Sequence, residues 1–155
     1  MKFKIFIGLF AILFLSFDCK HSQKENETEQ TIFVFGGGMN VKFIEYTAEL
    51  TKKKSPKICY VPTASADNSE HITYYNNICK QLSLEPYVLS VWISSENTDK
   101  SFEDILLDMD AIIVGGGNTL NMLGIWQVQG IDKVLRKALE KGIDRKSTRL
   151  NSSHT

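Results

Sequence analysis

Two runs of three glycines are the residues of this sequence best suited to chemistry. Gly36–Gly38 follows the apolar run 32–35, and Gly115–Gly117 follows the apolar run 111–114. A glycine triplet after a strand exposes bare backbone N–H groups, because no side chain fills the space where a ligand must enter. Such groups can stabilise the negative oxygen that forms during acyl transfer, and losing one donor costs about 3 to 4 kcal/mol. The pattern therefore indicates an oxyanion hole.

A nucleotide-binding loop is the main alternative for these glycines. Both triplets contain the first two glycines of a dinucleotide-binding fingerprint, but Val41 and Leu120 occupy the place of the third. The sequence also lacks the Gly-Lys-Ser/Thr of a phosphate-binding loop. Each glycine has a structural explanation too, as a tight turn or a close contact between helix and sheet. Two triplets at equivalent places favour the oxyanion hole.

An oxyanion hole needs a nucleophile, and the sequence offers none with a base beside it. Ser65 lies in a loop after an apolar run, where a serine usually makes a local hydrogen bond. His71 is expected at a helix start, as a surface or capping residue. The acidic residues Asp67, Glu70 and Asp99 are expected to be helix caps and solvated charges. None of these residues is predicted to be catalytic.

The elements that position the loops follow from the hydrophobic pattern. Strands are predicted over 32–35, 57–61, 87–91 and 111–114, and helices over 41–53, 67–83 and 102–107, from near 118, and from 131 to 142. Continuous apolar strands that alternate with helices predict an α/β fold, a doubly wound, flavodoxin-like parallel sheet with helices on both faces. Such sheets bind ligands at the carboxyl ends of their strands. The loops 36–40, 62–66 and 115–119 should therefore share one rim.

Composition narrows the class of partner. Of 155 residues, 43% are hydrophobic, and 18 basic residues balance 18 acidic ones, so no charge excess favours nucleic acid. The three histidines have no metal-ligand spacing, and we expect no metal and no cofactor. Cys59 and Cys79 are expected to be buried, and whether they pair is left open. A small peptide or other small partner is the better expectation.

The N-terminus is predicted to be an export signal. Residues 1–19 combine a basic start with about thirteen apolar residues, too few to span a bilayer comfortably, and 20–30 form a polar tether. A buried helix is the alternative for the apolar run. Cys19 stands where a lipoprotein signal places its acylated cysteine, although Asp18 is unusual before it. We expect an exported lipoprotein attached to a membrane through Cys19, or a cytoplasmic protein if the signal does not function.

The segments "KICYVPTASAD", "DAIIVGGGNTLNML" and "GIDKVLRKALEKGI" closely resemble peptidase E, the aspartyl dipeptidases. Cyanophycinases are their relatives, and the fold is similar to class I glutamine amidotransferases. The resemblance covers residues 31–143. It implies a serine peptidase that hydrolyses small peptides, Asp-X dipeptides above all, through an acyl-enzyme. It assigns Gly117 to the oxyanion hole and places Gly116, Asn118 and Thr119 at the substrate.

The sequence departs from this family after Ile143. Family members carry Gly-x-Ser-Ala-Gly on the next strand, which would put the nucleophile at about Arg149, and this sequence has no such motif. Residues 144–155 are polar and resemble adaptor-derived sequence, so no strand is predicted there. We expect a domain truncated after its fourth strand and the following helix, and an inactive chain. A non-catalytic ligand-binding module of the same fold, a cyanophycinase-like peptidase and a nucleotide-binding protein are the alternatives.

Overall fold

The structure is a computed structural model that describes residues 31–92, 99–142 and 144–148. Its strands are β1 (Ile32–Phe35), β2 (Ile58–Val61), β3 (Pro86–Val88), β4 (Ala111–Val114) and β5 (Asp144–Thr148). Its helices are α1 (Val41–Leu50), α2 (Ser69–Gln81), α3 (Phe102–Leu107), α4 (Thr119–Gln129) and α5 (Ile131–Glu140), with a 3-10 turn, η1 (Thr63–Ser65), after β2. The predicted alternation of strand and helix is confirmed.

The strands that the structure describes form one parallel sheet in the order β1-β5-β4-β2-β3. Its centre pairs Ile58 with Ala111 and Val61 with Val114. If β2 is counted as the first strand, then β3, β4 and β5 are the second, third and fourth. The order β3-β2-β4-β5 is then the flavodoxin order 2-1-3-4, and β1 is an additional strand beyond β5. The chain leaves β2 toward β3 and then crosses to β4 on the other side of β2. The topological switch point therefore lies between β2 and β4.

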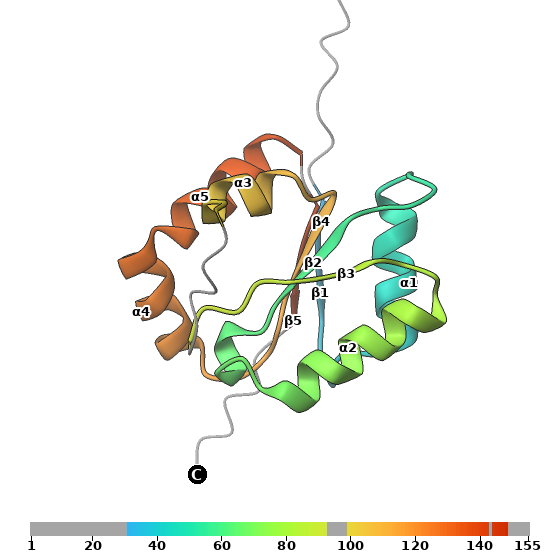
Figure 1. The fold of residues 1–155 in the computed structure, drawn as a ribbon, viewed down its shortest axis with the longest axis horizontal. Coiled ribbons are helices and arrows are strands. Elements are labelled where there is room, and N and C mark those ends of the chain that lie inside the picture. The colour runs from blue at the N-terminus through green and yellow to red at the C-terminus, as the bar shows by residue number, and fades with distance from the viewer. Residues whose placement is uncertain (1–30, 93–98, 143, 149–155) are drawn as a thin grey trace, which may run out of the picture.

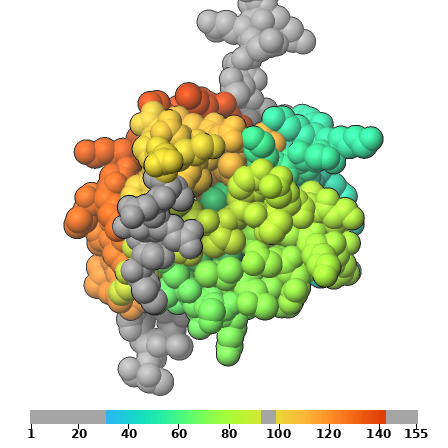
Figure 2. Space-filling model, viewed as in Figure 1, coloured from blue at the N-terminus to red at the C-terminus, as the bar shows by residue number. Residues whose placement is uncertain are grey.

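Helices cover both faces of the sheet (Figure 1). Because successive strand residues face opposite sides, Ile58 and Tyr60 pack with α1 and α2, whereas Cys59 and Val61 pack with α3, α4 and α5. Both central strands are wholly buried, which explains their continuous apolar sequence. Figure 2 shows the two helical layers in space-filling form, with α4 and α5 in orange on one side and α2 in green on the other. This arrangement confirms the doubly wound α/β fold.

Most predicted bounds agree with the structure, and the third strand differs most. It was expected over 87–91 but ends at Val88. The cause is Asp67, whose carboxylate accepts the backbone N–H groups of Val91 at 2.5 Å and Trp92 at 2.7 Å. These N–H groups therefore bond to a side chain. The expectation that Asp67 caps a helix or lies solvated is wrong, because Asn68 caps α2.

The prediction of no strand after Ile143 is also wrong. Residues Asp144–Thr148 form β5, which pairs with β4 on one side and with β1 on the other. The sheet therefore does not end after its fourth strand. Backbone N–H and C=O groups make these bonds irrespective of side chains, so a polar segment can fill the place between two parallel strands. The polarity of 144–148 misled the prediction.

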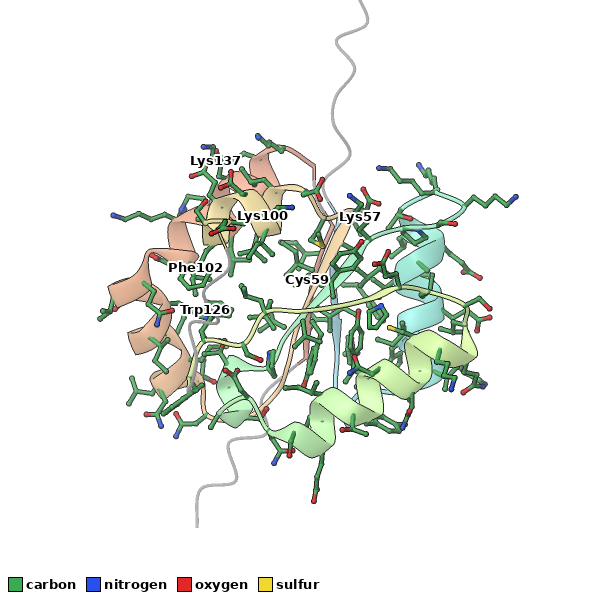
Figure 3. The ribbon with its side chains drawn as sticks, viewed as in Figure 1. Lys57, Cys59, Lys100, Phe102, Trp126 and Lys137 are labelled. Carbon is green, nitrogen blue, oxygen red and sulfur yellow. The ribbon has the colours of Figure 1, made fainter. Side chains whose placement is uncertain are left out.

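Cys59 and Cys79 are both buried with free thiols. Cys59 faces α3, α4 and α5 (Figure 3), whereas Cys79 lies on α2, in the cluster on the opposite face. A disulfide between them would have to pass through the sheet. The sequence left open whether Cys59 and Cys79 pair. In the structure they do not, because Cys59 points to one face of the sheet and α2 covers the other.

The predicted signal of residues 1–19, the tether of 20–30 and the lipid site at Cys19 lie outside the described residues. Among the residues that the structure describes, none of the helices has the length and apolar character needed to cross a membrane.

Candidate functional site

The predicted rim is at the carboxyl ends of β1, β2 and β4, at the lower end of Figure 1. Two loops meet there at the topological switch point, where ligands bind in open α/β sheets. One is the 62–67 loop, which follows β2. The other is the glycine loop, residues 115–118, which follows β4 and leads into α4. The site is therefore built from these two loops.

Gly115 is structural. It is buried, and its N–H donates to the carbonyl of Val61 at 3.0 Å. A Cβ at this position would lie 2.7 Å from the Tyr60 hydroxyl oxygen, closer than such atoms approach. The expectation that all three glycine amides await an oxyanion is thus wrong for Gly115, because its N–H continues the bonding between β4 and β2.

Gly116 and Gly117 differ from Gly115. Neither N–H has a hydrogen-bond acceptor among the described residues, and Gly117 is exposed. Gly117 has φ +143°, a conformation that side chains rarely adopt, and a Cβ there would overlap the Ala64 carbonyl and lie 2.9 Å from the Ser65 nitrogen. The loop can form only with glycine at 117. Its two unbonded N–H groups are donors that a ligand oxygen can use.

Asn118 begins α4 and ties it to the 62–67 loop. Its side chain accepts the N–H of Asn121 at 3.0 Å, and its own N–H donates to the Ala64 carbonyl at 2.7 Å. Thr119 follows as the first residue of α4 and is half-buried. The N-terminus of this eleven-residue helix lies next to Gly117, where its dipole favours negative charge. Asn118 thus shapes the glycine loop through its backbone and side-chain hydrogen bonds.

The 62–67 loop is tightly folded. Ala66 and Asp67 have φ of 56° and 52°, which non-glycine residues rarely adopt. The Ser65 hydroxyl donates to the Pro62 carbonyl at 2.9 Å, so it makes the local bond that the sequence suggested. His71 is exposed in the first turn of α2, where its N–H bonds to Asn68. The structure does not pair the serine with that histidine.

Thr63, in the same loop, is a residue that sequence reasoning missed. It is fully buried, its hydroxyl accepts the indole N–H of Trp126 at 3.1 Å, and its carbonyl accepts that of Trp92 at 2.7 Å. Trp126 points from α4 toward the sheet (Figure 3). A threonine buried at the end of an apolar strand was the available signal, but its partners are 63 and 29 positions away in the chain.

The first glycine triplet differs from the second. Gly36–Gly38 is exposed, and a Cβ added at any of the three would contact nothing within 4 Å. Gly37 and Gly38 have φ of 84° and 90°, so they make a turn into α1. The structure therefore places the two triplets on one rim and joins only the second to the 62–67 loop.

Other chemistry finds little support among the described residues. Burial raises the pKa of the Cys59 thiol to about 12, so at neutral pH it is protonated and unreactive. Burial also raises the pKa of Tyr60, beside Gly115, and the nearby Ser65 side chain offsets a smaller part of this rise. No group of three His, Cys, Asp or Glu residues within the described ranges could hold a metal ion.

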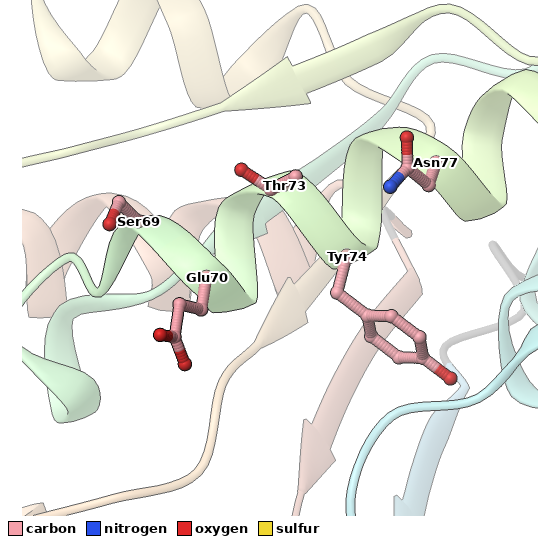
Figure 4. Close-up of a pocket in the computed structure, with 5 residues that line it drawn as sticks. All are labelled: Ser69, Glu70, Thr73, Tyr74 and Asn77. Carbon is pink, nitrogen blue, oxygen red and sulfur yellow. The ribbon is translucent and has the colours of Figure 1, made fainter.

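A shallow hollow of about 360 Å³ lies along α2 (Figure 4). Its lining residues are Ser69, Glu70, Thr73, Tyr74 and Asn77, which all belong to this one helix. The glycine loop does not contribute to it. We therefore assign the site to the loops and not to this hollow.

Comparison with known proteins agrees with the geometry. Residues 32–144 match peptidase family S51. The chain is 34% identical over 120 residues to the uncharacterized peptidase YgaJ of Bacillus subtilis (strain 168), covering 74% of this chain and 51% of YgaJ. The chain thus spans about half the length of this curated relative.

Two solved structures have a similar fold. A peptidase from an acI-B1 Actinobacterium superposes with a TM-score of 0.60 at 16% identity, over 76% of this chain and 52% of the other. A protein assigned to peptidase E from Listeria monocytogenes EGD-e gives a TM-score of 0.54 at 19% identity, over 73% and 56%. At these identities the likeness concerns the fold alone.

Proposed function

Because the chain belongs to peptidase family S51, we propose that it is part of a serine peptidase that hydrolyses small peptides with an N-terminal aspartate through an acyl-enzyme. In this reaction a serine attacks the peptide carbonyl carbon, and the carbonyl oxygen becomes negative. The N–H groups of Gly116 and Gly117 hold that oxygen. They suit the task because they are unbonded within the described residues and are fixed by the fold.

The single observation that carries the proposal is the conformation of Gly117. A φ of +143° and the close approach to the Ala64 carbonyl restrict position 117 to glycine, and its neighbour Gly116 is only partly exposed. Glycine is the residue used where the backbone must approach a ligand closely. The N-terminus of α4 adds positive potential at the same place. The loop is thus prepared for an anionic oxygen before any substrate arrives.

The sheet topology supports a place for the nucleophile of such a peptidase. β5 runs parallel to β4, with Ser147 opposite Val114 and Thr148 opposite Phe35, so its carboxyl end is on the rim that carries both glycine triplets. A nucleophile elbow after β5 would lie on the same rim as Gly117. The sequence has Arg149 at that position, and a guanidinium is not a nucleophile. We therefore propose that this chain binds substrate without cleaving it.

An NMR titration with two ligands tests this function. L-Aspartate, the product of Asp-X hydrolysis, should shift the amide signals of Gly116 and Gly117, because its carboxylate replaces the oxyanion. The amide of Gly38, exposed on the loop that follows β1, is the matched control and should not move. Aspartyl-p-nitroanilide should shift the same two signals and release no p-nitroaniline.

Each outcome separates the candidates. Absence of any shift at Gly116 and Gly117 with both ligands contradicts the proposed site. A third titration, with acetate, tests whether any small carboxylate is bound. Shifts of equal size with acetate and with L-aspartate favour a non-catalytic module for small anions. Release of p-nitroaniline that stops with a serine-directed inhibitor contradicts the proposed inactivity of this chain.

Export and lipid attachment are a separate proposal, supported by the basic start and apolar run of residues 1–19. Cells that express the protein should incorporate radioactive palmitate into it, and Cys19→Ser should abolish the label. Equal labelling of the two proteins, or none in either, contradicts attachment through Cys19.

A further inference from the structure

We propose that Thr63 is a positioning residue, which fixes the glycine loop by holding the Ala64 carbonyl in place. This inference rests on the proposed function, because the glycine loop must be the oxyanion site for the positioning to affect binding. It is carried by a chain of contacts that begins at two tryptophans, passes through Thr63 and ends at Asn118 and Gly117.

The first step is the buried pair of Thr63 and Trp126. Both residues are almost completely buried, and the indole N–H of Trp126 donates to the Thr63 hydroxyl at 3.1 Å. A buried indole N–H that loses its acceptor is costly, because no water replaces the bond. Trp126 lies in the second turn of α4, the helix that the glycine loop leads into. The pair therefore joins the 62–67 loop to α4.

The second step concerns the backbone carbonyl of Thr63, which is held by different residues than its side chain. The Thr63 carbonyl accepts the indole N–H of Trp92 at 2.7 Å and the N–H of Ala66 at 3.1 Å. The backbone of Trp92 in turn donates to the carboxylate of Asp67 at 2.7 Å. Thr63 is thus held from α4 through its side chain and from the segment after β3 through its backbone. Two independent attachments leave it little freedom to move.

The third step transmits this position to the site. Ala64, next in the chain, is buried, and its carbonyl accepts the Asn118 N–H at 2.7 Å. The same carbonyl lies against Gly117, where a Cβ would overlap it. A shift of Thr63 therefore moves the Ala64 carbonyl and releases both residues of the glycine loop. The N–H groups of Gly116 and Gly117 would then lose their fixed direction.

The experiment compares Thr63→Val with Thr47→Val. Thr47 is an equally buried threonine, but its hydroxyl donates to the Phe43 carbonyl within α1, on the opposite face of the sheet. Thr63→Val should speed hydrogen exchange of the Asn118 amide about tenfold and weaken L-aspartate binding about tenfold, the effect of losing one hydrogen bond. Thr47→Val should change neither quantity. Thr63→Ser, which keeps the hydroxyl, should restore both to wild-type values.

The amide of Ile112, in the wholly buried strand β4 between β2 and β5, reports global stability in every variant. Equal acceleration at Ile112 and Asn118 in Thr63→Val overturns the positioning role, and so does unchanged exchange at Asn118. If Thr63→Val does not fold, Trp126→Phe removes the same bond and keeps a ring in the core. If the wild-type chain binds no L-aspartate, the proposed function fails, and exchange at Asn118 still decides whether Thr63 positions the loop.

Discussion

Replacement of Gly117 by alanine should destabilise the protein more than the same replacement at any other exposed glycine that the structure describes in a turn. Gly117 is exposed, so burial alone would predict a small effect. The structure predicts a large one for two reasons. Its φ of +143° is unfavourable for alanine, and the added Cβ would overlap the Ala64 carbonyl. The backbone of the 62–67 loop cannot yield cheaply, because Thr63 is held on both sides.

The expected magnitude follows from these two terms. Forcing alanine into this region of φ costs about 1 to 3 kcal/mol. Displacing the Ala64 carbonyl breaks its bond with the Asn118 N–H, which adds about 1 kcal/mol. Gly117→Ala should therefore lower the free energy of unfolding by about 2 to 4 kcal/mol, a large part of the roughly 5 to 15 kcal/mol typical of a domain.

Two other glycines separate the cost of backbone strain from the cost of the contact with Ala64. Gly38 has φ +90° and open space around it, so Gly38→Ala tests backbone strain alone and should cost about 1 to 2 kcal/mol. Gly124 lies within α4 with nothing within 4 Å, so Gly124→Ala should stabilise the protein by about 0.5 to 1 kcal/mol. Urea unfolding followed by circular dichroism gives all three values. A cost for Gly117→Ala no larger than that for Gly38→Ala would refute the contact with Ala64.

Three further predictions concern residues away from the loop. Tyr75→Phe removes a buried hydroxyl that donates to a β2 carbonyl at 2.6 Å, so it should cost about 1 to 3 kcal/mol by thermal unfolding, whereas Tyr74→Phe on the exposed side of α2 should change nothing. Burial raises the pKa of Cys59 to about 12, so iodoacetamide at pH 8 should leave that thiol unmodified until urea unfolds the protein. Peptide mass measures the labelling, and rapid labelling of the native protein would contradict the burial of Cys59. Hydrogen bonds from the Ser101 hydroxyl and N–H lower the pKa of Asp104, so its stabilising effect is complete at neutral pH and is lost as pH falls through that lowered value. Ser101 is the N-cap of α3, and it forms a capping box with Asp104. The urea midpoint of Asp104→Asn should consequently fall less between pH 7 and pH 3 than that of the wild type, and equal falls would contradict a stabilising role of this capping box.

The sequence predicted the fold well because the signals are local. Four apolar runs, a helical spacing from Ile131 onward and the polar residues at helix starts each act within a few positions of the chain. It did not predict β5, because the pairing of 144–148 depends on backbone groups of β1 and β4, not on its own composition. It also placed the end of β3 three residues too late, since the carboxylate of Asp67 takes two of the backbone N–H groups.

By itself, the sequence determined the α/β class, the two glycine triplets and their place on one rim, because strand, turn and helix patterns are written in consecutive residues. Only the tertiary structure decided that the triplets differ: Gly115 is bonded to β2, Gly117 is locked against Ala64, and Gly36–Gly38 contacts neither. The same holds for the partners of Thr63. These are contacts between residues that are distant in the chain, and only the packing of α4 and β2 around the switch point brings them together.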